Sequence, residues 1–228
     1  MTQSQLLFLF ITLNVVGLTQ CSPRITPELQ EKREEAVSQD SSTQVLQNSL
    51  SDCVKFKDIK KSDEALEAYV LYRDFFKLNQ FEEALPYWRK VYKMAPAADG
   101  QRYVVYTDGV YLFEYLSNEA PTETQKYEYI DTLLTLYDEA MECYPDYEGF
   151  LMARKVYDVY YKYPSTYTKK QQLNMFLHAG RLLENDMPYF VINPFTALLV
   201  ESFQNGEIDT VETRKWAEFE REQAAKDR

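Results

Sequence analysis

The distribution of hydrophobic residues along the chain changes twice. Residues 1–20 are uncharged and largely apolar, whereas residues 22–61 are polar and have no sustained apolar period. From Glu64 onward, hydrophobic residues recur at intervals of three and four positions, which is typical of amphipathic helices. Strand-like alternation is weak throughout. The pattern therefore predicts an all-α protein whose helical part follows an apolar segment and a polar stretch.

Turn and cap residues divide the helical part into about seven or eight helices. The breaks fall at Asn79, Pro96, Pro145, Pro164 and Gly206. Two Thr-x-x-Gln sequences, which begin at Thr122 and Thr168, predict helix N-termini closed by capping boxes. Asn193 and Pro194 predict an N-cap and first turn for a further helix. A last helix is expected from Thr210 onward.

The first twenty residues resemble a cleaved signal peptide. The apolar run Leu6–Leu13 is shorter than the roughly 20 residues that a membrane-spanning helix needs. The sequence Leu18-Thr19-Gln20-Cys21 resembles a bacterial lipobox, in which the Cys carries a lipid. We therefore expect lipid attachment at Cys21, a flexible polar tether over residues 21–61 and a helical domain over residues 62–228. An ordinary cleaved signal with an incidental Cys is the alternative.

Composition excludes several classes of function. The chain has 25 Lys and Arg against 36 Asp and Glu, a formal net charge of −11, so it lacks the basic surface of a nucleic-acid binder. A single His, His178, excludes metal sites built from several histidines. Six Gly leave no glycine-rich loop for a phosphate group. We therefore expect no catalytic residues, no cofactor, no metal site and no nucleic-acid partner.

The cysteines leave two possibilities open. If Cys21 is lipidated, Cys53 and Cys143 remain, and an oxidising compartment would allow them to pair. The sequence does not give their separation in space, which decides whether they can. Cys143 lies in an apolar helical stretch, where a buried free thiol is the commoner outcome.

Residues 65–96 contain a pattern of large, small and aromatic residues. It falls on Leu71, Phe75, Phe81, Ala84, Trp88 and Pro96. Ala84 would allow two helices to approach closely, and Trp88 would fill the space between them. This stretch resembles a tetratricopeptide (TPR) repeat, and residues 100–145 resemble a second, degenerate repeat with Gly109 at its small position.

The resemblance implies a right-handed α-solenoid of stacked antiparallel helix pairs. Residues 147–228 fit this architecture as helix pairs but show little of the repeat pattern. Tyr72 stands where the family prefers a small residue, which predicts looser or rearranged packing there. As a whole, the chain is similar to TPR-containing envelope proteins of Bacteroidota. That similarity implies a lipoprotein on the periplasmic face of the outer membrane, held to the membrane by its N-terminal lipid.

TPR proteins are usually non-catalytic adaptors that bind a protein or peptide along a groove, and the first helix of each pair lines that groove. The resemblance places groove positions at Leu66, Tyr69, Arg73, Phe76 and Lys77 in the first repeat, and at Tyr103, Tyr106, Val110 and Phe113 in the second. Aromatic rings with cations beside them can hold an extended segment by stacking and charge-assisted hydrogen bonds. Packing between helices is the alternative for each ring.

Two further points concern what the groove would recognise. Arg73 replaces the Asn with which chaperone-binding TPRs hold a free C-terminal carboxylate, so recognition of a chain end is not expected. A short glycan-binding lipoprotein is the alternative function, because the tyrosine-rich stretch 157–167 could stack on sugars.

Overall fold

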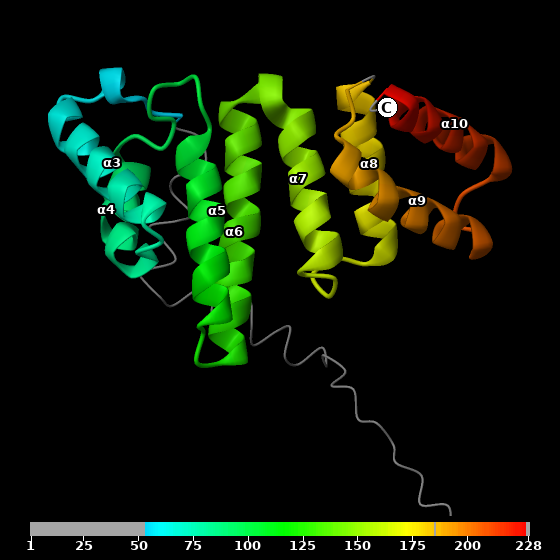
Figure 1. The fold of residues 1–228 in the computed structure, drawn as a ribbon, viewed down its shortest axis with the longest axis horizontal. Helices are drawn as coiled ribbons and strands as arrows, with labels where there is room; N and C mark the ends of the chain where they lie inside the picture. The colour runs from blue at the N-terminus through cyan, green and yellow to red at the C-terminus, as the bar shows by residue number, and fades with distance from the viewer. Residues whose placement is uncertain (1–52, 185, 227–228) are drawn as a thin grey trace, which may run out of the picture. The chain divides into compact units, whose positions relative to one another are not determined.

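The computed structural model describes residues 53–184 and 186–226, and the regular secondary structure of these residues is entirely helical (Figure 1). They form eight α-helices and two short 3-10 helices. The α-helices are α3 (Ser62–Lys77), α4 (Phe81–Met94), α5 (Val104–Asn118), α6 (Glu123–Cys143), α7 (Glu148–Tyr161), α8 (Lys169–Leu183), α9 (Tyr189–Gln204) and α10 (Thr210–Lys226). The 3-10 helices are η1 (Phe56–Asp58) and η2 (Pro145–Tyr147). The predicted all-α class is therefore confirmed for the described part of the chain.

Consecutive helices form four pairs, α3–α4, α5–α6, α7–α8 and α9–α10, which follow one another in the order of the sequence (Figure 1). The two helices of each of the first three pairs lie side by side and run in opposite directions, because short connections join them. The predicted signal peptide, the predicted lipid-attachment residue Cys21 and the rest of residues 21–52 lie outside the described residues.

Local sequence explains where several helices begin and end. After α3, Asn79 takes a left-handed backbone conformation with φ of 57°, which Asn tolerates better than most residues. The capping box predicted at Thr168 is confirmed, since Thr168 and Gln171 each satisfy a backbone amide of the other. At Thr122, the structure shows the threonine half of the box, in which its hydroxyl accepts from the amide of Gln125 at 3.2 Å.

The predicted start of the seventh helix at Asn193 and Pro194 is wrong. The corresponding helix, α9, begins at Tyr189 and contains Pro194 in its interior. Starting earlier places Val191 on the buried face that also carries Phe195, and both side chains are fully buried. This burial offsets the backbone hydrogen bond that Pro194 cannot donate.

The helices enclose two cores. The first core lies among α3, α4, α5, α6 and one face of α7 around Trp88, whose indole Nε1 donates a hydrogen bond to the backbone oxygen of Val105 at 2.7 Å. Gly109 leaves room for this ring, since a Cβ atom there would lie 2.3 Å from Trp88 and 2.8 Å from Leu136. The second core lies among α7, α8, α9 and α10 and includes Trp216. Gly109 thus has to be small because α5 approaches Trp88 closely.

Tyr72 is part of the first core. Its side chain is fully buried, and its ring makes an edge contact with that of Tyr69 at 5.3 Å between centroids. Burial is the main cause that raises the pKa of the Tyr72 hydroxyl, and the neighbouring carboxyl of Asp108 adds to it. The looser packing predicted at this position is therefore not observed.

A disulfide bond joins Cys53 to Cys143, the last residue of α6, with 5.3 Å between their Cα atoms. Two backbone hydrogen bonds hold the same segment: the amide of Phe56 donates to Ala98 at 2.9 Å, and the oxygen of Val54 accepts from Ala97 at 3.0 Å. The favoured expectation of a free buried thiol is therefore wrong. Residues 53–61, which the sequence predicts as the end of the tether, lie against the helical domain.

Candidate partner-binding groove

The described residues show neither a membrane-spanning helix nor a metal site. None of their helices is long and apolar enough to cross a membrane. No three His, Cys, Asp or Glu side chains in the described ranges are grouped so that they could hold a metal ion. His178 faces one carboxylate, with 3.3 Å between its Nε2 and Oε1 of Glu148, and both side chains are partly exposed. These two residues form a surface contact between α8 and α7.

The predicted groove residues of the first repeat lie on α3. The guanidinium of Arg73 pairs with the carboxylate of Asp108 on α5 and lies 5.8 Å from the ring centroid of Phe76. Burial raises the pKa of Asp108, and the Arg73 guanidinium opposes that rise. The guanidinium of Arg73 is therefore engaged in an ion pair within the protein. Tyr69 and Phe76 are half-buried, and Lys77 is exposed.

The predicted groove residues of the second repeat need correction. Tyr106, Val110 and Phe113 are only 2, 4 and 8 % exposed, because α5 is covered by its neighbours on that face. Phe113 makes an edge contact with Trp88 at 5.6 Å between ring centroids. Tyr106 and Phe113 are thus core residues in this structure and present almost no surface to a partner. Tyr103 is half-buried.

A cleft of about 220 Å³ lies between α5 and α7, and Val110 is part of its lining. Its lining comes from α5, α6, α7 and α9. The lining residues are Thr107, Val110, Tyr111, Glu114, Tyr137, Phe150, Leu151, Arg154, Asp158 and Phe190. Aromatic side chains predominate among them, so we call this the aromatic cleft. Tyr111 is 51 % exposed at its edge, and its ring contacts that of Phe76 at 6.3 Å, which links the cleft to α3.

Arg154 is half-buried in the aromatic cleft. Its guanidinium carbon lies 5.4 Å from the ring centroid of Phe190 and 5.8 Å from that of Tyr157, within the range of cation–π attraction. Burial lowers the pKa of Arg154, but the neighbouring Tyr137 and Asp158 raise it, and the net effect is a raised pKa. Within the described part of the chain, Arg154 forms no ion pair.

Asp158 is held by other partners. Its carboxylate accepts a hydrogen bond from the Tyr137 hydroxyl at 2.7 Å, and its other oxygen lies 3.3 Å from Nζ of Lys162. Lys162 also pairs with Glu114 across the helices at 2.8 Å. One lysine therefore pairs with both carboxylates that line the aromatic cleft.

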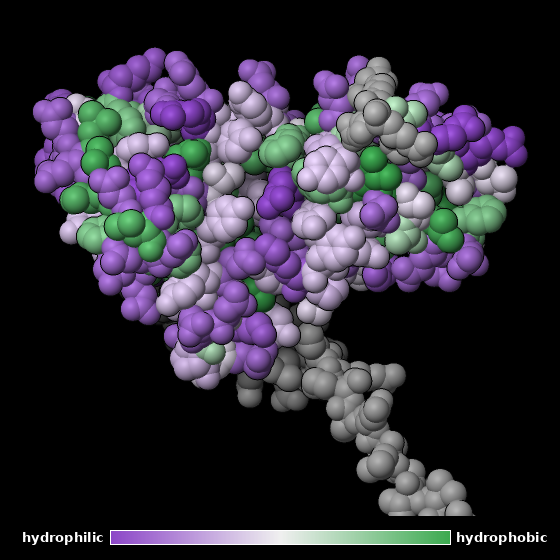
Figure 2. Space-filling model, in the orientation of Figure 1, coloured by the Kyte–Doolittle hydropathy of each residue, from purple (hydrophilic) through white to green (hydrophobic). Residues whose placement is uncertain are grey.

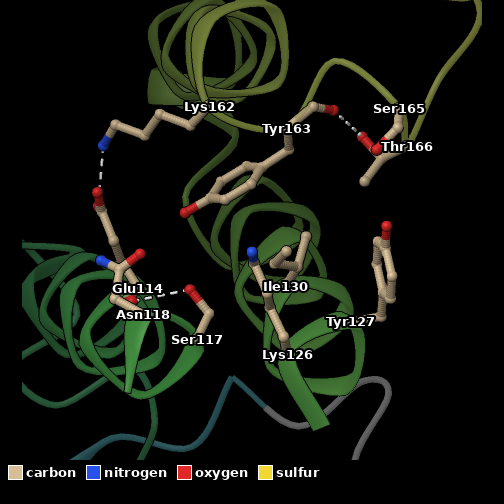
Figure 3. A pocket seen from close by; sticks show the side chains of 10 residues that line it. All are labelled: Glu114, Ser117, Asn118, Lys126, Tyr127, Ile130, Lys162, Tyr163, Ser165 and Thr166. Atoms are coloured by element: carbon tan, nitrogen blue, oxygen red, sulfur yellow. Dashed lines mark hydrogen bonds and ion pairs between the residues drawn. The ribbon is translucent and has the colours of Figure 1, made fainter. Parts of the chain in front are cut away.

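A second hollow, of about 260 Å³, lies near the C-terminal ends of α5 and α7 (Figure 3). Its lining residues are Glu114, Ser117, Asn118, Lys126, Tyr127, Ile130, Lys162, Tyr163, Ser165 and Thr166. Hydroxyl, amide and charged groups predominate, so we call it the polar hollow. Figure 3 shows the hydroxyl of Tyr163 and the ammonium group of Lys126 directed toward the same space.

The aromatic cleft and the polar hollow adjoin each other. Glu114 lines both, and its ion pair with Lys162 lies between them. On α5 the lining residues extend from Thr107 to Asn118, which spans about 16 Å at 1.5 Å per residue. An extended peptide of about five residues has that length. We call the two hollows together the α5–α7 groove.

The α5–α7 groove differs from the apolar surface at the start of the helical domain. On α3, Leu66, Val70 and the adjoining Leu78 are exposed apolar residues. Figure 2 shows hydrophobic residues gathered over the α3–α4 end of the face that it presents, and mainly hydrophilic ones over the lower part of α5 and α6. The groove combines rings with three cationic side chains, one of which, Arg154, forms no ion pair in the described residues.

Sequence reasoning did not find Phe150, Arg154 and Phe190. The TPR pattern fades after residue 145, so no register was available to assign first-helix positions on α7 and α9. A usable signal was present, because Phe150, Arg154 and Tyr157 recur at intervals of four and three residues and therefore share one helix face. In the tyrosine-rich stretch 157–167, Tyr163 is buried and Tyr161 is exposed.

Comparison of the chain with protein-family models, with curated proteins and with solved structures finds no match. The geometry of the groove is therefore what indicates the function of the chain.

Proposed function

We propose that this protein is a non-catalytic interaction scaffold that binds an extended segment of a partner protein in the α5–α7 groove. The observation that carries the proposal is the convergence of rings from α5, α7 and α9 around Arg154, which forms no ion pair in the described residues. Aromatic and Arg side chains are enriched in protein interfaces and supply many of the residues that dominate binding energy. The observed arrangement is therefore suited to an interface.

The same proposal includes the TPR-like right-handed α-solenoid. Consecutive helix pairs and the close contact of Trp88 with Gly109 support it. In a solenoid of this kind the first helices of the pairs, α3, α5, α7 and α9, share one face. The predicted residues Tyr69, Arg73, Phe76 and Lys77 of α3 would then extend the groove beyond Tyr111, which Phe76 contacts.

We further propose export and attachment to the envelope through a lipid on Cys21, at the periplasmic face of the outer membrane. The disulfide between Cys53 and Cys143 supports export, because disulfides persist mainly in oxidising compartments. Incorporation of labelled palmitate should be lost in Cys21→Ala. Labelling that this substitution leaves unchanged would remove the basis for the anchor.

Site-specific photo-crosslinking tests the binding function. A benzoylphenylalanine at Tyr111, at the edge of the groove, should capture a partner protein in cells that make this chain. The same probe at Phe203, a 43 % exposed ring at the other end of α9, is the matched control and should not. Introducing Arg154→Gln beside the Tyr111 probe should reduce capture about tenfold, since a charge-assisted contact is removed.

Two results would contradict the proposal. Equal capture from the two probe positions would mean that the groove has no special role. Binding on a glycan array together with an absence of any captured protein would favour the alternative, a glycan-binding protein.

A further inference from the structure

We propose that the α5–α7 groove selects an extended acidic segment of a partner protein. In this segment a large apolar residue is followed by an acidic residue whose carboxylate pairs with Arg154. A second acidic residue, about four positions later, pairs with Lys126. This inference rests on the proposed function and specifies the partner chemistry of the same groove. It follows from the distribution of charge along the groove and from the length that separates its two ends.

The cations at the two ends of the groove are the ones left without strong partners. In the middle, Lys162 pairs with both Glu114 and Asp158, so its charge is fully engaged. At the aromatic end, Arg154 forms no ion pair within the described residues. At the polar end, the only described ion pair of Lys126 is with Glu123 at 4.0 Å, between two largely exposed side chains, a geometry that contributes little.

Two other cations of neighbouring positions are already paired. Arg73 of α3 is bound to Asp108, and Nζ of Lys155 on α7 lies 2.6 Å from the carboxylate of Asp138. The lining of the groove carries three cations, Lys126, Arg154 and Lys162, against two carboxylates. A net positive lining stands out in a chain whose formal charge is −11. An acidic segment would be attracted to this groove and repelled by most of the remaining surface.

The rings beside Arg154 explain why an apolar residue should accompany the first carboxylate. Phe150, Leu151 and Phe190 line the cleft and can bury a side chain of that kind. A carboxylate bound there would be partly removed from water, which strengthens its bond to the guanidinium. A basic residue in the same place would be opposed by the half-buried charge of Arg154.

The spacing between the two carboxylates follows from α7. Arg154 and Lys162 lie on one face of this helix and its end, eight positions apart, or about 12 Å at 1.5 Å per residue. Lys126 lines the same hollow as Lys162, so we take the 12 Å from Arg154 to Lys162 as an estimate of the separation of Arg154 from Lys126. An extended chain covers 12 Å in about four residues. From the aromatic end to the polar end of the groove, the expected order is thus an apolar residue, an acidic residue, about three spacer residues and a second acidic residue.

Fluorescence anisotropy with labelled peptides and the purified full chain tests this order. The probe peptide has phenylalanine, glutamate, three serine or threonine residues and glutamate. Replacing the first glutamate by glutamine should weaken binding about tenfold, and so should replacing phenylalanine by alanine. Arg154→Gln should weaken binding of the probe about tenfold. It should hardly affect the peptide in which glutamine replaces the first glutamate, because the protein variant and the peptide variant remove the same contact between Arg154 and that glutamate.

The second contact has a matched control. Lys126→Glu should weaken binding of the probe about tenfold, whereas Lys93→Glu, the same change at an exposed position of α4, should not. Circular dichroism of each variant verifies that it is folded. If Lys126→Glu and Lys93→Glu weaken binding equally, the peptide is attracted by the overall charge of the protein and not by Lys126, and the inference is overturned.

The remaining outcomes separate this inference from the function on which it rests. Failure of the probe peptide to bind at about 1 mM, or equal binding of peptides with glutamate and glutamine, overturns the inference. If photo-capture from Tyr111 persists in that case, the binding function stands and only the acidic specificity falls. If capture from Tyr111 fails as well, both fall.

Discussion

Each half of the helical domain contains one tryptophan that covers one glycine, yet the two halves are built differently. In the first core, Trp88 lies against Gly109, and in the second core Trp216 lies against Gly180, where a Cβ atom would be 2.9 Å from the ring. Both glycines allow a helix to approach a large ring closely. The same contact thus occurs twice, which makes its surroundings directly comparable.

Hydrogen bonds and a disulfide link distant segments of the chain around the first core. Trp88 donates its indole hydrogen to the backbone of Val105, and the hydroxyl of Tyr144 donates to the backbone oxygen of Ala97 at 2.7 Å. The disulfide closes the same region. These links connect segments that are far apart in the sequence, so we expect the first core to be the more stable of the two.

Among the described residues, buried polar atoms without a hydrogen bond are more numerous in the second core. There they are Oε1 of Gln172, Oε1 of Glu220 and Nε2 of Gln223, whereas the first core has the hydroxyl of Tyr72, and Oδ1 of Asp158 on α7 also has none. An unsatisfied buried polar atom costs about 1–3 kcal/mol. We therefore expect the same packing of a ring on a glycine to stabilise the second core less, because more of the polar groups around it are unsatisfied.

The largest expected effect comes from removing the rings. Trp88→Ala should lower the free energy of unfolding by about 4 kcal/mol, because it leaves a cavity over Gly109 and removes the bond to Val105. Trp216→Ala is the matched change in the second core and should cost about 3 kcal/mol. Urea unfolding followed by circular dichroism measures both. A larger loss for Trp216→Ala would reverse the comparison.

Loss of the disulfide should come next. The double substitution Cys53→Ser/Cys143→Ser should lower the free energy of unfolding by about 3 kcal/mol, because the bridge closes a loop with a sequence separation of 90. Hydrogen exchange should accelerate at η1 and α3 and stay unchanged at α9. Addition of a reductant should destabilise the wild type and leave the double variant unaffected. Faster exchange at α9 to the same extent would mean that loss of the disulfide loosens both cores alike, which would contradict this prediction.

The smallest of the three effects concerns Glu220 in the second core. Burial raises the pKa of its carboxyl to about 7, and the hydrogen bond from Thr196 opposes the rise. From about pH 4.5 to 7 the unfolded chain loses this proton while the folded protein keeps it, so this carboxyl lowers the free energy of unfolding as pH rises through that window. Above about pH 7 its contribution is constant.

Glu220→Gln removes that contribution, because an amide stays neutral at every pH. The variant should be more stable than the wild type by about 2 kcal/mol at pH 8, and the difference should shrink toward pH 4.5. Urea unfolding across this range measures it. The other buried carboxyls, such as Asp108, titrate equally in both proteins and cancel in the difference. A constant difference across the range would mean that Glu220 does not titrate in this window.

Much of the helical fold could be predicted from the sequence. The spacing of apolar residues and the caps at Thr122 and Thr168 predict the ends of most helices to within a few residues of those in the structure. The start of α9 was missed because a proline is usually a boundary signal, and here the burial of Val191 and Phe195 outweighs it. The disulfide could not be predicted because the pairing depends on a distance across the fold.

Less of the candidate site could be predicted. An aromatic groove was expected on α3 and α5, but the TPR register alone could not tell which rings of α5 point outward. Tyr106 and Phe113 are covered by neighbouring helices, whereas Tyr111 is exposed. Arg73 was expected to bind a partner, but in the structure its guanidinium pairs with Asp108. Whether a charged side chain is free to bind another protein depends on whether it already has an ion-pair partner. For Arg73 that partner lies on another helix, so the local sequence does not reveal it.

The bond between Cys53 and Cys143 also determines the path of a mechanical load. A pull on the chain ahead of Cys53 passes through the two sulfur atoms directly to the end of α6. The covalent loop that the bridge closes, which includes α3, α4 and α5, is bypassed by the tension. The α5 side of the groove therefore lies outside the path of a pull between the two ends of the chain, and the strain would fall on the junction of α6 with α7.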